Sequence, residues 1–101
     1  MTEYLGDSFG VFSATGKPQE IRIRFDSFAA RLVRERKWHA SQRIKDLDNG
    51  DIELTIKLGN LTEIQRWVLS WGEHARVIAP KELFDRIAKT ITTLNAEYTK
   101  R

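Results

Sequence analysis

Two segments of the chain alternate strictly between apolar and polar residues. Residues 20–25 set three apolar side chains between charged ones, and residues 51–58 repeat the pattern over a longer run. A period of two places the apolar side chains on one face of a strand and the polar ones on the other. We therefore predict two half-buried strands of a sheet that has one covered face.

Three further segments carry apolar residues at helical spacing. The first follows the capping residues Asp26-Ser27 and is expected to end near Lys37. The second is expected to have Thr62 as its cap and Gly72 just beyond its C-terminus. The third starts at Pro80, because the N–H that proline lacks has no partner at the first helical position. Its apolar stripe consists of Leu83, Phe84, Ile87, Ile91, Leu94 and Tyr98.

The connections predict the fold class. Asp48-Asn49-Gly50-Asp51 is a strong hairpin signal, since Asn-Gly adopts the positive φ angles of a primed turn, and it joins a strand at 41–47 to the strand at 51–58. A short fourth strand is expected at 75–79. The resulting order predicts an α+β protein, a ferredoxin-like βαββαβ sandwich with an extra C-terminal helix. Two helices would cover one face of its antiparallel sheet and leave the other face open.

Composition narrows the class without identifying it. The 101 residues suffice for one modest domain, and 41% hydrophobic with 31% charged residues suits a soluble globular one. The absence of cysteine excludes disulfides and cysteine-based metal sites and is compatible with a reducing cytoplasm. No apolar run is long enough to span a membrane. The net charge of +3 is too small to indicate a nucleic-acid binder by itself.

Residues 1–18 differ from the rest and are predicted to be an incoming arm, with the folded domain at 19–101. Glycines interrupt any regular period in this arm, and Gly16-Lys17-Pro18 forms a turn signal that closes it. Its apolar side chains require a covering surface, either on this domain or on a neighbour. They are Tyr4, Leu5, Phe9, Val11 and Phe12.

Several strings between about residue 5 and residue 95 together resemble one bacterial family, the C-terminal extension (WCX) domain of WYL-domain transcription regulators. The strings are Ile21–Phe25, Ala29-Ala30, Glu35–Gln42, Asp48-Asn49-Gly50, Trp67–Gly72 and Val77–Leu83. The resemblance implies a ferredoxin-like fold, dimerisation, and effector-dependent control of DNA binding. It also implies that the effector is a nucleotide or nucleic acid.

The resemblance also implies what would lie upstream. In that family the module follows a helix-turn-helix domain and a WYL domain, and neither is present here, since no tryptophan of this chain is followed by tyrosine. The chain is therefore expected to be a C-terminal piece, with residues 1–18 as the linker from the missing WYL domain. DNA binding is not expected of the piece itself.

A row of cations is the first candidate binding site. Six are expected to share the open face of the sheet: Arg22, Arg24, Arg43, Lys45, Lys57 and Arg76. Arg43 and Lys45 lie on this face only if Ile44 points inward, and Arg76 lies on it only if Val77 points inward. Glu53 is expected to be the only strand acid among them. The face is either simply solvated or a phosphate-reading surface, and without aromatic residues it does not match an RNA recognition motif.

The segment Arg36–Gln42 is the second candidate. In one interpretation Trp38 packs on the end of the first helix while Ser41 and Gln42 satisfy loop backbone groups. In the other, His39 and Gln42 contact a ligand. His39 and His74 are the only imidazoles and lack the neighbours that a metal site needs, so we predict no metal and no cofactor.

Other aromatic and apolar residues leave more than one role open. Trp67 and Trp71 share a helical stripe with Ile64 and Val68, which favours core packing over a stacking or cofactor role. The end of the last helix is expected to pack on this domain, on the missing domain or on a second copy.

No catalytic motif is present, so the chain is predicted to be non-enzymatic. The sequence thus predicts a cytoplasmic regulatory and dimerisation module of a WYL-type regulator, a homodimer in the full-length protein, which takes part in sensing an anionic effector. The alternative is a free-standing ferredoxin-like domain that binds nucleic acid.

Overall fold

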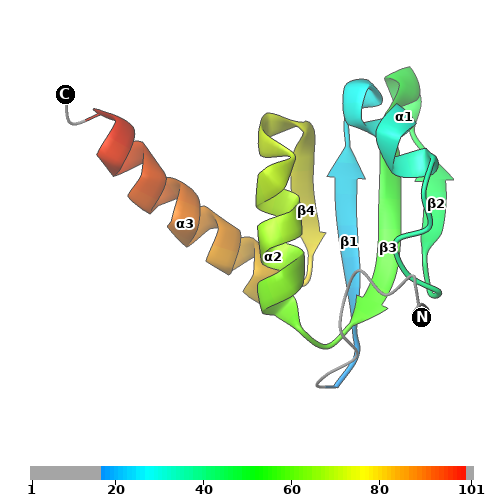
Figure 1. Ribbon diagram of the computed structural model, residues 1–101, viewed down its shortest axis with the longest axis horizontal. Helices are drawn as coiled ribbons and strands as arrows, with labels where there is room; N and C mark the ends of the chain where they lie inside the picture. The colour runs from blue at the N-terminus through cyan, green and yellow to red at the C-terminus, as the bar shows by residue number, and fades with distance from the viewer. Residues whose placement is uncertain (1–16, 100–101) are drawn as a thin grey trace.

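The computed structural model describes residues 17–99, so most of the predicted arm lies outside the described residues. Within that range the chain forms four strands and three α-helices, with short turns at Asp48–Gly50 and Gly72–His74 (Figure 1). The elements are β1 Gln19–Phe25, α1 Ser27–Arg34, β2 Arg43–Asp46, β3 Ile52–Leu58, α2 Leu61–Ser70, β4 Ala75–Ala79 and α3 Lys81–Thr99. The predicted α+β class is confirmed.

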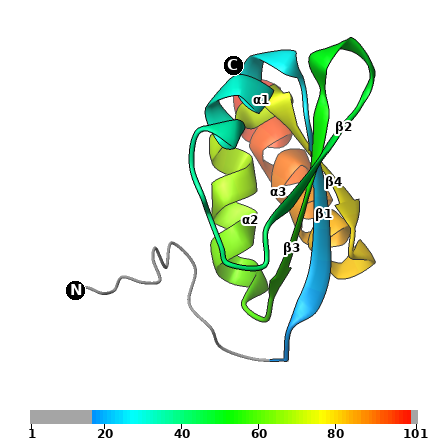
Figure 2. The same cartoon turned by 90° about the vertical axis from the view of Figure 1, so that its right-hand side faces the viewer.

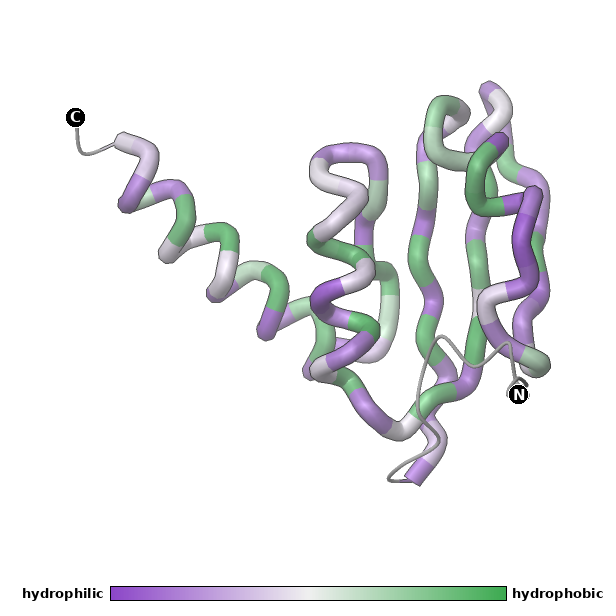
Figure 3. Tube along the Cα trace, in the orientation of Figure 1, coloured by the Kyte–Doolittle hydropathy of each residue, from purple (hydrophilic) through white to green (hydrophobic). Residues whose placement is uncertain are grey.

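The four strands make one antiparallel sheet in the order β2-β3-β1-β4. Inward residues of β1 and β3 face each other, as in the pair Ile23 and Leu54. Buried and accessible positions alternate along both strands, and Figure 3 shows the matching alternation of hydropathy. The period of two therefore fixed the two faces of the sheet as predicted.

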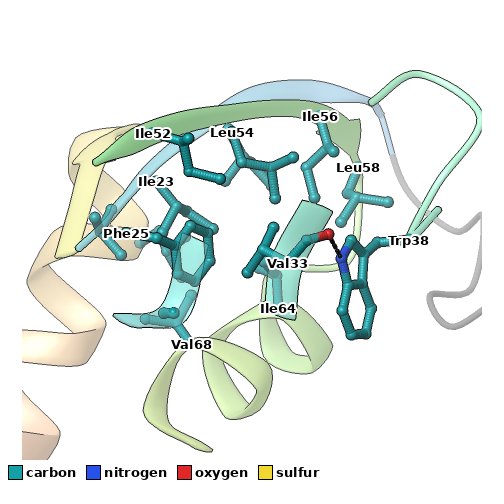
Figure 4. Packing of buried hydrophobic residues seen from close by; sticks show 14 of the residues in the cluster. Ile23, Phe25, Val33, Trp38, Ile52, Leu54, Ile56, Leu58, Ile64 and Val68 are labelled. Atoms are coloured by element: carbon teal, nitrogen blue, oxygen red, sulfur yellow. Dashed lines mark hydrogen bonds between the residues drawn. The ribbon is translucent and has the colours of Figure 1, made fainter. Parts of the chain in front are cut away.

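Both shorter helices cover the same face of this sheet (Figure 2). Ala29, Ala30 and Val33 of α1 join one buried cluster with the inward strand residues, and α2 adds Ile64 and Val68 to the same cluster (Figure 4). Burial of each large aliphatic or aromatic side chain contributes about 1.5–3 kcal/mol to folding. The remaining members of the cluster are Ile21, Ile23, Phe25, Trp38, Ile52, Leu54, Ile56, Leu58, Leu61, Val77 and Leu83.

The hairpin between β2 and β3 turns on two residues with positive φ. Asn49 has φ 63° and Gly50 has φ 84°, as the Asn-Gly signal predicted. The N–H of Leu47 donates to the carbonyl oxygen of Asp51 at 2.8 Å and closes the turn. A Cβ atom on Gly50 would lie 3.1 Å from the Cβ of Ser27, so glycine also lets the turn approach α1.

The predicted boundaries of α1, α2 and β2 were wrong by one to three residues. α1 ends at Arg34 rather than near Lys37, and the chain then turns so that Trp38 reaches the helix end. The N-cap of α2 is Asn60, whose Oδ1 accepts from the N–H groups of residues 62 and 63; Thr62, the predicted cap, lies inside the helix. β2 is shorter than its predicted range of 41–47.

α3 follows Pro80, whose carbonyl oxygen accepts from the N–H of Phe84, so the helix begins one residue later than predicted. Figure 1 shows it running away from the sheet toward its C-terminus. Leu83 is buried and Ile87 packs partly against the core, whereas the four other stripe residues are exposed. No helix in the described range is both long enough and apolar enough to cross a bilayer.

Candidate functional site

The open face of the sheet carries all six predicted cations. Ile44 packs against the core and Val77 is buried, so both conditions on which the prediction depended are met. The register sets Lys45 and Arg24 on either side of Glu53, and Arg24 in turn faces Arg76 on β4. The six lie side by side, and their role as ligand contacts stays a prediction.

Acidic side chains neutralise half of these cations, and here the prediction was wrong. Glu53 is not the only strand acid, because Glu20 lies on β1 and its Oε2 accepts from Arg43 at 3.2 Å. Asp51, just before β3, accepts from Nη2 of Arg24 at 2.9 Å. The Nε of Arg22 donates to Oε2 of Glu53 at 2.7 Å.

The pair of Arg22 and Glu53 is the least exposed of these three. The hydrogen bond from Arg22 is the main reason that the pKa of Glu53 lies below its usual value. Burial opposes this shift, and the nearby charges of Arg22, Lys45 and Arg24 lower the pKa further. The same hydrogen bond raises the pKa of Arg22 above its usual value. Both shifts favour the charged forms of the pair.

Three cations of the face form no ion pair with any described residue: Lys45, Lys57 and Arg76 are exposed to solvent. Phe25 is the only aromatic residue on the described strands, and it is fully buried on the helix side. The face can thus attract anions through charge and through guanidinium hydrogen bonds, and it offers no ring on which a base could stack.

The corner after α1 is held by its own side chains. The indole Nε1 of Trp38 donates to the carbonyl oxygen of Val33 at 3.0 Å, and the ring is 7% exposed (Figure 4). Gln42 accepts from the N–H of Trp38 at 2.6 Å and donates to the carbonyl oxygen of Arg36 at 3.3 Å. Ser41 Oγ accepts from the N–H of Lys57 at 2.8 Å. The structural interpretation of this segment is confirmed for Trp38, Ser41 and Gln42.

His39 occupies the same corner with one nitrogen engaged. Its Nδ1 accepts from the N–H of Ser41 at 3.1 Å and lies 2.7 Å from Oγ of that residue. The backbone N–H of Ser41 can donate only to an unprotonated Nδ1, and the Ser41 hydroxyl can donate to the same nitrogen. This assigns the proton of the neutral ring to Nε2, which has no partner among residues 17–99 and can donate to a ligand.

The tryptophans form a packing cluster. Trp67 and Trp71 both pack edge-to-face with Phe25 at ring-centroid distances of 5.6 Å, and the ring centroid of Trp38 lies 5.0 Å from that of Trp67. Nε1 of Trp71 is buried without a hydrogen-bond partner in the described part of the chain. The contacts favour the core role of these rings over a stacking platform.

A polar contact at the other end of the sheet was not predicted from the sequence. Nδ1 of His74 lies 2.7 Å from Oδ2 of Asp26, while Oδ1 of the same carboxylate accepts from the N–H of Ala29 and caps α1. These bonds lower the pKa of Asp26, the one from Ala29 most, and the bond to Asp26 raises the pKa of His74. Phe28 stacks on the imidazole with ring centroids 4.5 Å apart.

This contact borders a shallow polar hollow that also includes Arg24, Asp51, Glu73 and Arg76. The hollow holds as many acids as bases and so has no strong preference for an anion. No group of three metal-ligating side chains occurs within residues 17–99. His74 and Asp26 are 48 residues apart in the sequence, which explains why local sequence patterns could not reveal this pair.

Comparison with known families identifies the class of this α+β domain. A family model described as the WCX domain matches residues 17–94, nearly the whole of the described range. The chain belongs to the WCX domain family, a regulatory type of domain, as its motif strings predicted. No match was found among curated proteins.

Proposed function

We propose that this chain is the C-terminal regulatory and dimerisation module of a WYL-domain transcription regulator in a bacterial cytoplasm. The match to the WCX family over residues 17–94 is the observation that carries the proposal. Upstream WYL and helix-turn-helix domains would be its partners within the same polypeptide. The module would then be non-enzymatic and would act by biasing the arrangement of the domains that bind DNA.

The proposal includes a ferredoxin-like arrangement. The sheet order β2-β3-β1-β4 supports it, as does the placement of α1 and α2 on one face. In this arrangement the covered face is given over to packing. The open face is then the natural surface for an effector.

The effector surface we propose is the row of six cations, with His39 and Gln42 as secondary contacts at its end. Six cations against Glu20, Asp51 and Glu53 leave the face with a positive balance. An anionic ligand, a nucleotide or single-stranded nucleic acid, would gain most from lysines such as Lys45 and Lys57, because neither forms an ion pair with a described acid. Such a ligand would shift the regulator toward the state that it binds better.

The second candidate function is a free-standing nucleic-acid-binding domain. The same positive face supports it. The lack of strand aromatics on that face argues against base stacking and so favours backbone contacts without sequence preference. The two functions differ in whether ligand binding alters a DNA-binding domain on the same chain.

Fluorescence anisotropy with a labelled single-stranded oligonucleotide, at low and moderate salt, tests the effector surface. The variant Lys45→Gln plus Lys57→Gln should weaken binding severalfold and flatten the salt dependence, because each phosphate contact contributes a slope of about 0.7 in log K against log salt. An adenosine nucleotide as competitor distinguishes a nucleotide effector from a polymer.

The matched control removes the same charge from the helix side through Arg31→Gln plus Arg66→Gln, two exposed positions without a described ion pair. It should leave the salt dependence nearly unchanged. Equal weakening by both double variants, or no binding by the unaltered chain at low salt, would contradict the proposed surface.

A further inference from the structure

α3 presents a continuous apolar face that the rest of the described domain leaves largely open. Phe84, Ile91 and Leu94 are 46%, 52% and 47% exposed, and Tyr98 near the end of the helix is 79% exposed. These residues recur at intervals of three, four and seven positions and so occupy one side of the helix. Exposed apolar faces of this extent indicate an interaction surface.

Two hollows lie along this face and share Ile91. The first is open to solvent between β4 and the first half of α3, and Arg76 is its one charged wall residue. The second is formed by α3 alone, from Ile91, Leu94, Asn95 and Tyr98. The other walls of the first hollow are Ala75, Val77, Phe84, Ile87, Ala88 and Ile91.

The distal half of α3 has little intrinsic support. A helix of about ten residues without tertiary contacts is marginal in water. Residues 90–99 include one charged residue, Glu97, and otherwise only apolar and uncharged polar side chains. The chemistry thus favours a long, neutral and apolar partner over an ionic one, and a second α3 has that chemistry.

We propose that this face binds a second copy of the chain, with the two α3 helices packed antiparallel about a two-fold axis near residues 92 and 93. Ile91 of each copy then faces Leu94 of the partner subunit. Tyr98 of each copy reaches the level of Ile87 of the partner subunit and enters the hollow beside β4. Antiparallel helices also align their dipoles favourably.

The tyrosine and the hollow match in chemistry. The aromatic body of Tyr98 suits the mostly apolar walls of the first hollow. A parallel pairing would place the two Tyr98 rings against each other and leave both hollows empty. The antiparallel register fills both hollows at once, as an isologous interface requires.

The area agrees with a reversible dimer. Four side chains of this size that are roughly half exposed would remove on the order of 400 Å² per copy from water. Two copies, with the rim, reach the lower end of specific interfaces, near about 1,000 Å² in total. The dimer should therefore form and dissociate with concentration.

Sedimentation velocity over a series of concentrations tests the pairing on the full 101-residue chain. We expect a concentration-dependent dimer whose dissociation constant rises at least tenfold in Leu94→Lys and in Tyr98→Lys. The matched control is Leu32→Lys on α1, which makes the same change at a helical position of similar exposure, 43% against 47%. A chain that stays monomeric at the highest concentration, or a dimer weakened equally by Leu32→Lys, would overturn the proposal.

Spin-label distances test the register, and the chain has no cysteine to interfere. Labels on Thr93→Cys should lie close to each other across the axis, whereas labels on Thr99→Cys should be separated by roughly 20 Å more along the helices, at a rise of 1.5 Å per residue. Equal distances at the two positions would rule out the antiparallel pairing.

This inference deepens the dimerisation part of the proposed function, and its test is independent of the effector part. Lys45 and Lys57 line neither hollow, so oligonucleotide binding and dimerisation can fail separately. A dimer insensitive to changes on α3 would overturn this interface and leave the proposed function standing.

Discussion

Arg22 donates through Nε to Glu53 at 2.7 Å, so a central cation of the open face is already engaged by a carboxylate of the neighbouring strand. The face is consequently less positive than its row of basic residues suggests. An anionic ligand that used Arg22 would therefore compete with Glu53 for its guanidinium group.

Glu53→Gln should increase affinity for a single-stranded oligonucleotide severalfold and steepen its salt dependence, since Arg22 and Lys45 lose a competing carboxylate. Anisotropy titration at two salt concentrations measures both effects. Stability should change by about 1 kcal/mol or less, because the amide oxygen of glutamine can still accept the hydrogen bond from Arg22. Glu35→Gln removes the same charge from an exposed position at the end of α1 and should have a much smaller effect. Equal effects of the two substitutions would contradict a specific role for Glu53.

Asp26 and His74 should make stability depend on pH in both directions. The raised pKa of His74 means that its contribution is complete below about 6.5 and is lost as pH rises through the folded value. The lowered pKa of Asp26 means that its contribution is complete above about 4 and is lost as pH falls. The pair should therefore stabilise the fold most between these limits.

Asp26→Asn tests this pair, because asparagine still caps α1 but carries no charge. NMR titration should find the pKa of His74 lowered toward the usual value for histidine. Asp85→Asn on α3 is the control and should leave the titration of His74 unchanged. A titration of His74 that does not respond to Asp26→Asn would show that the two groups are not coupled.

The two candidate caps of α2 allow a direct comparison. Asn60→Ala should lower the free energy of unfolding by about 1 kcal/mol, since its side chain accepts two otherwise unsatisfied N–H groups. Thr62→Ala should change the free energy of unfolding by only a few tenths of a kcal/mol. Thr62 lies within the helix, and its hydroxyl accepts only a long contact of 3.4 Å from Arg86. Urea denaturation followed by circular dichroism measures both, and a larger loss at Thr62 would contradict the assigned cap.

Trp38 and Trp71 differ in one hydrogen bond. Trp38→Phe should cost about 1–3 kcal/mol, since it removes the buried indole donor to the carbonyl oxygen of Val33, which then keeps only weaker backbone contacts such as the 3.5 Å one from the N–H of Arg36. Trp71→Phe should cost clearly less, because its buried Nε1 has no described partner and removing it relieves an unpaired donor. Thermal unfolding by circular dichroism compares them, and equal losses would show that ring packing alone holds the corner.

Prediction from sequence succeeded where local chemistry had a single structural solution. The alternation in β1 and β3 fixed which side chains face the helices, and Asn49-Gly50 fixed the turn. Prediction from sequence failed for the N-cap of α2, because the side chains of Asn60 and Thr62 can both serve as N-caps. Asn60 is used because the helix begins at once after β3 and Leu61 is buried at its first position.

The sequence predicted which cations share the open face of the sheet, but it did not predict how many of them are paired with acids. Strand periodicity grouped the cations, whereas their neutralisation depends on pairs such as Arg43 with Glu20, which are 23 residues apart. Such pairs follow from strand order and register. The exposure of α3 beyond Leu83 was likewise undetermined, because a helical stripe requires a partner without specifying which molecule provides it.

The sequence by itself determined the elements, the covered face and the family, because periodicity, caps and turn residues act over a few positions along the chain. Only the tertiary structure decided that Glu53 engages Arg22, that Asp26 meets His74, and that α3 leaves its apolar face open. These relationships join residues far apart in the sequence. They are set by the packing of whole elements, which no local pattern of residues encodes.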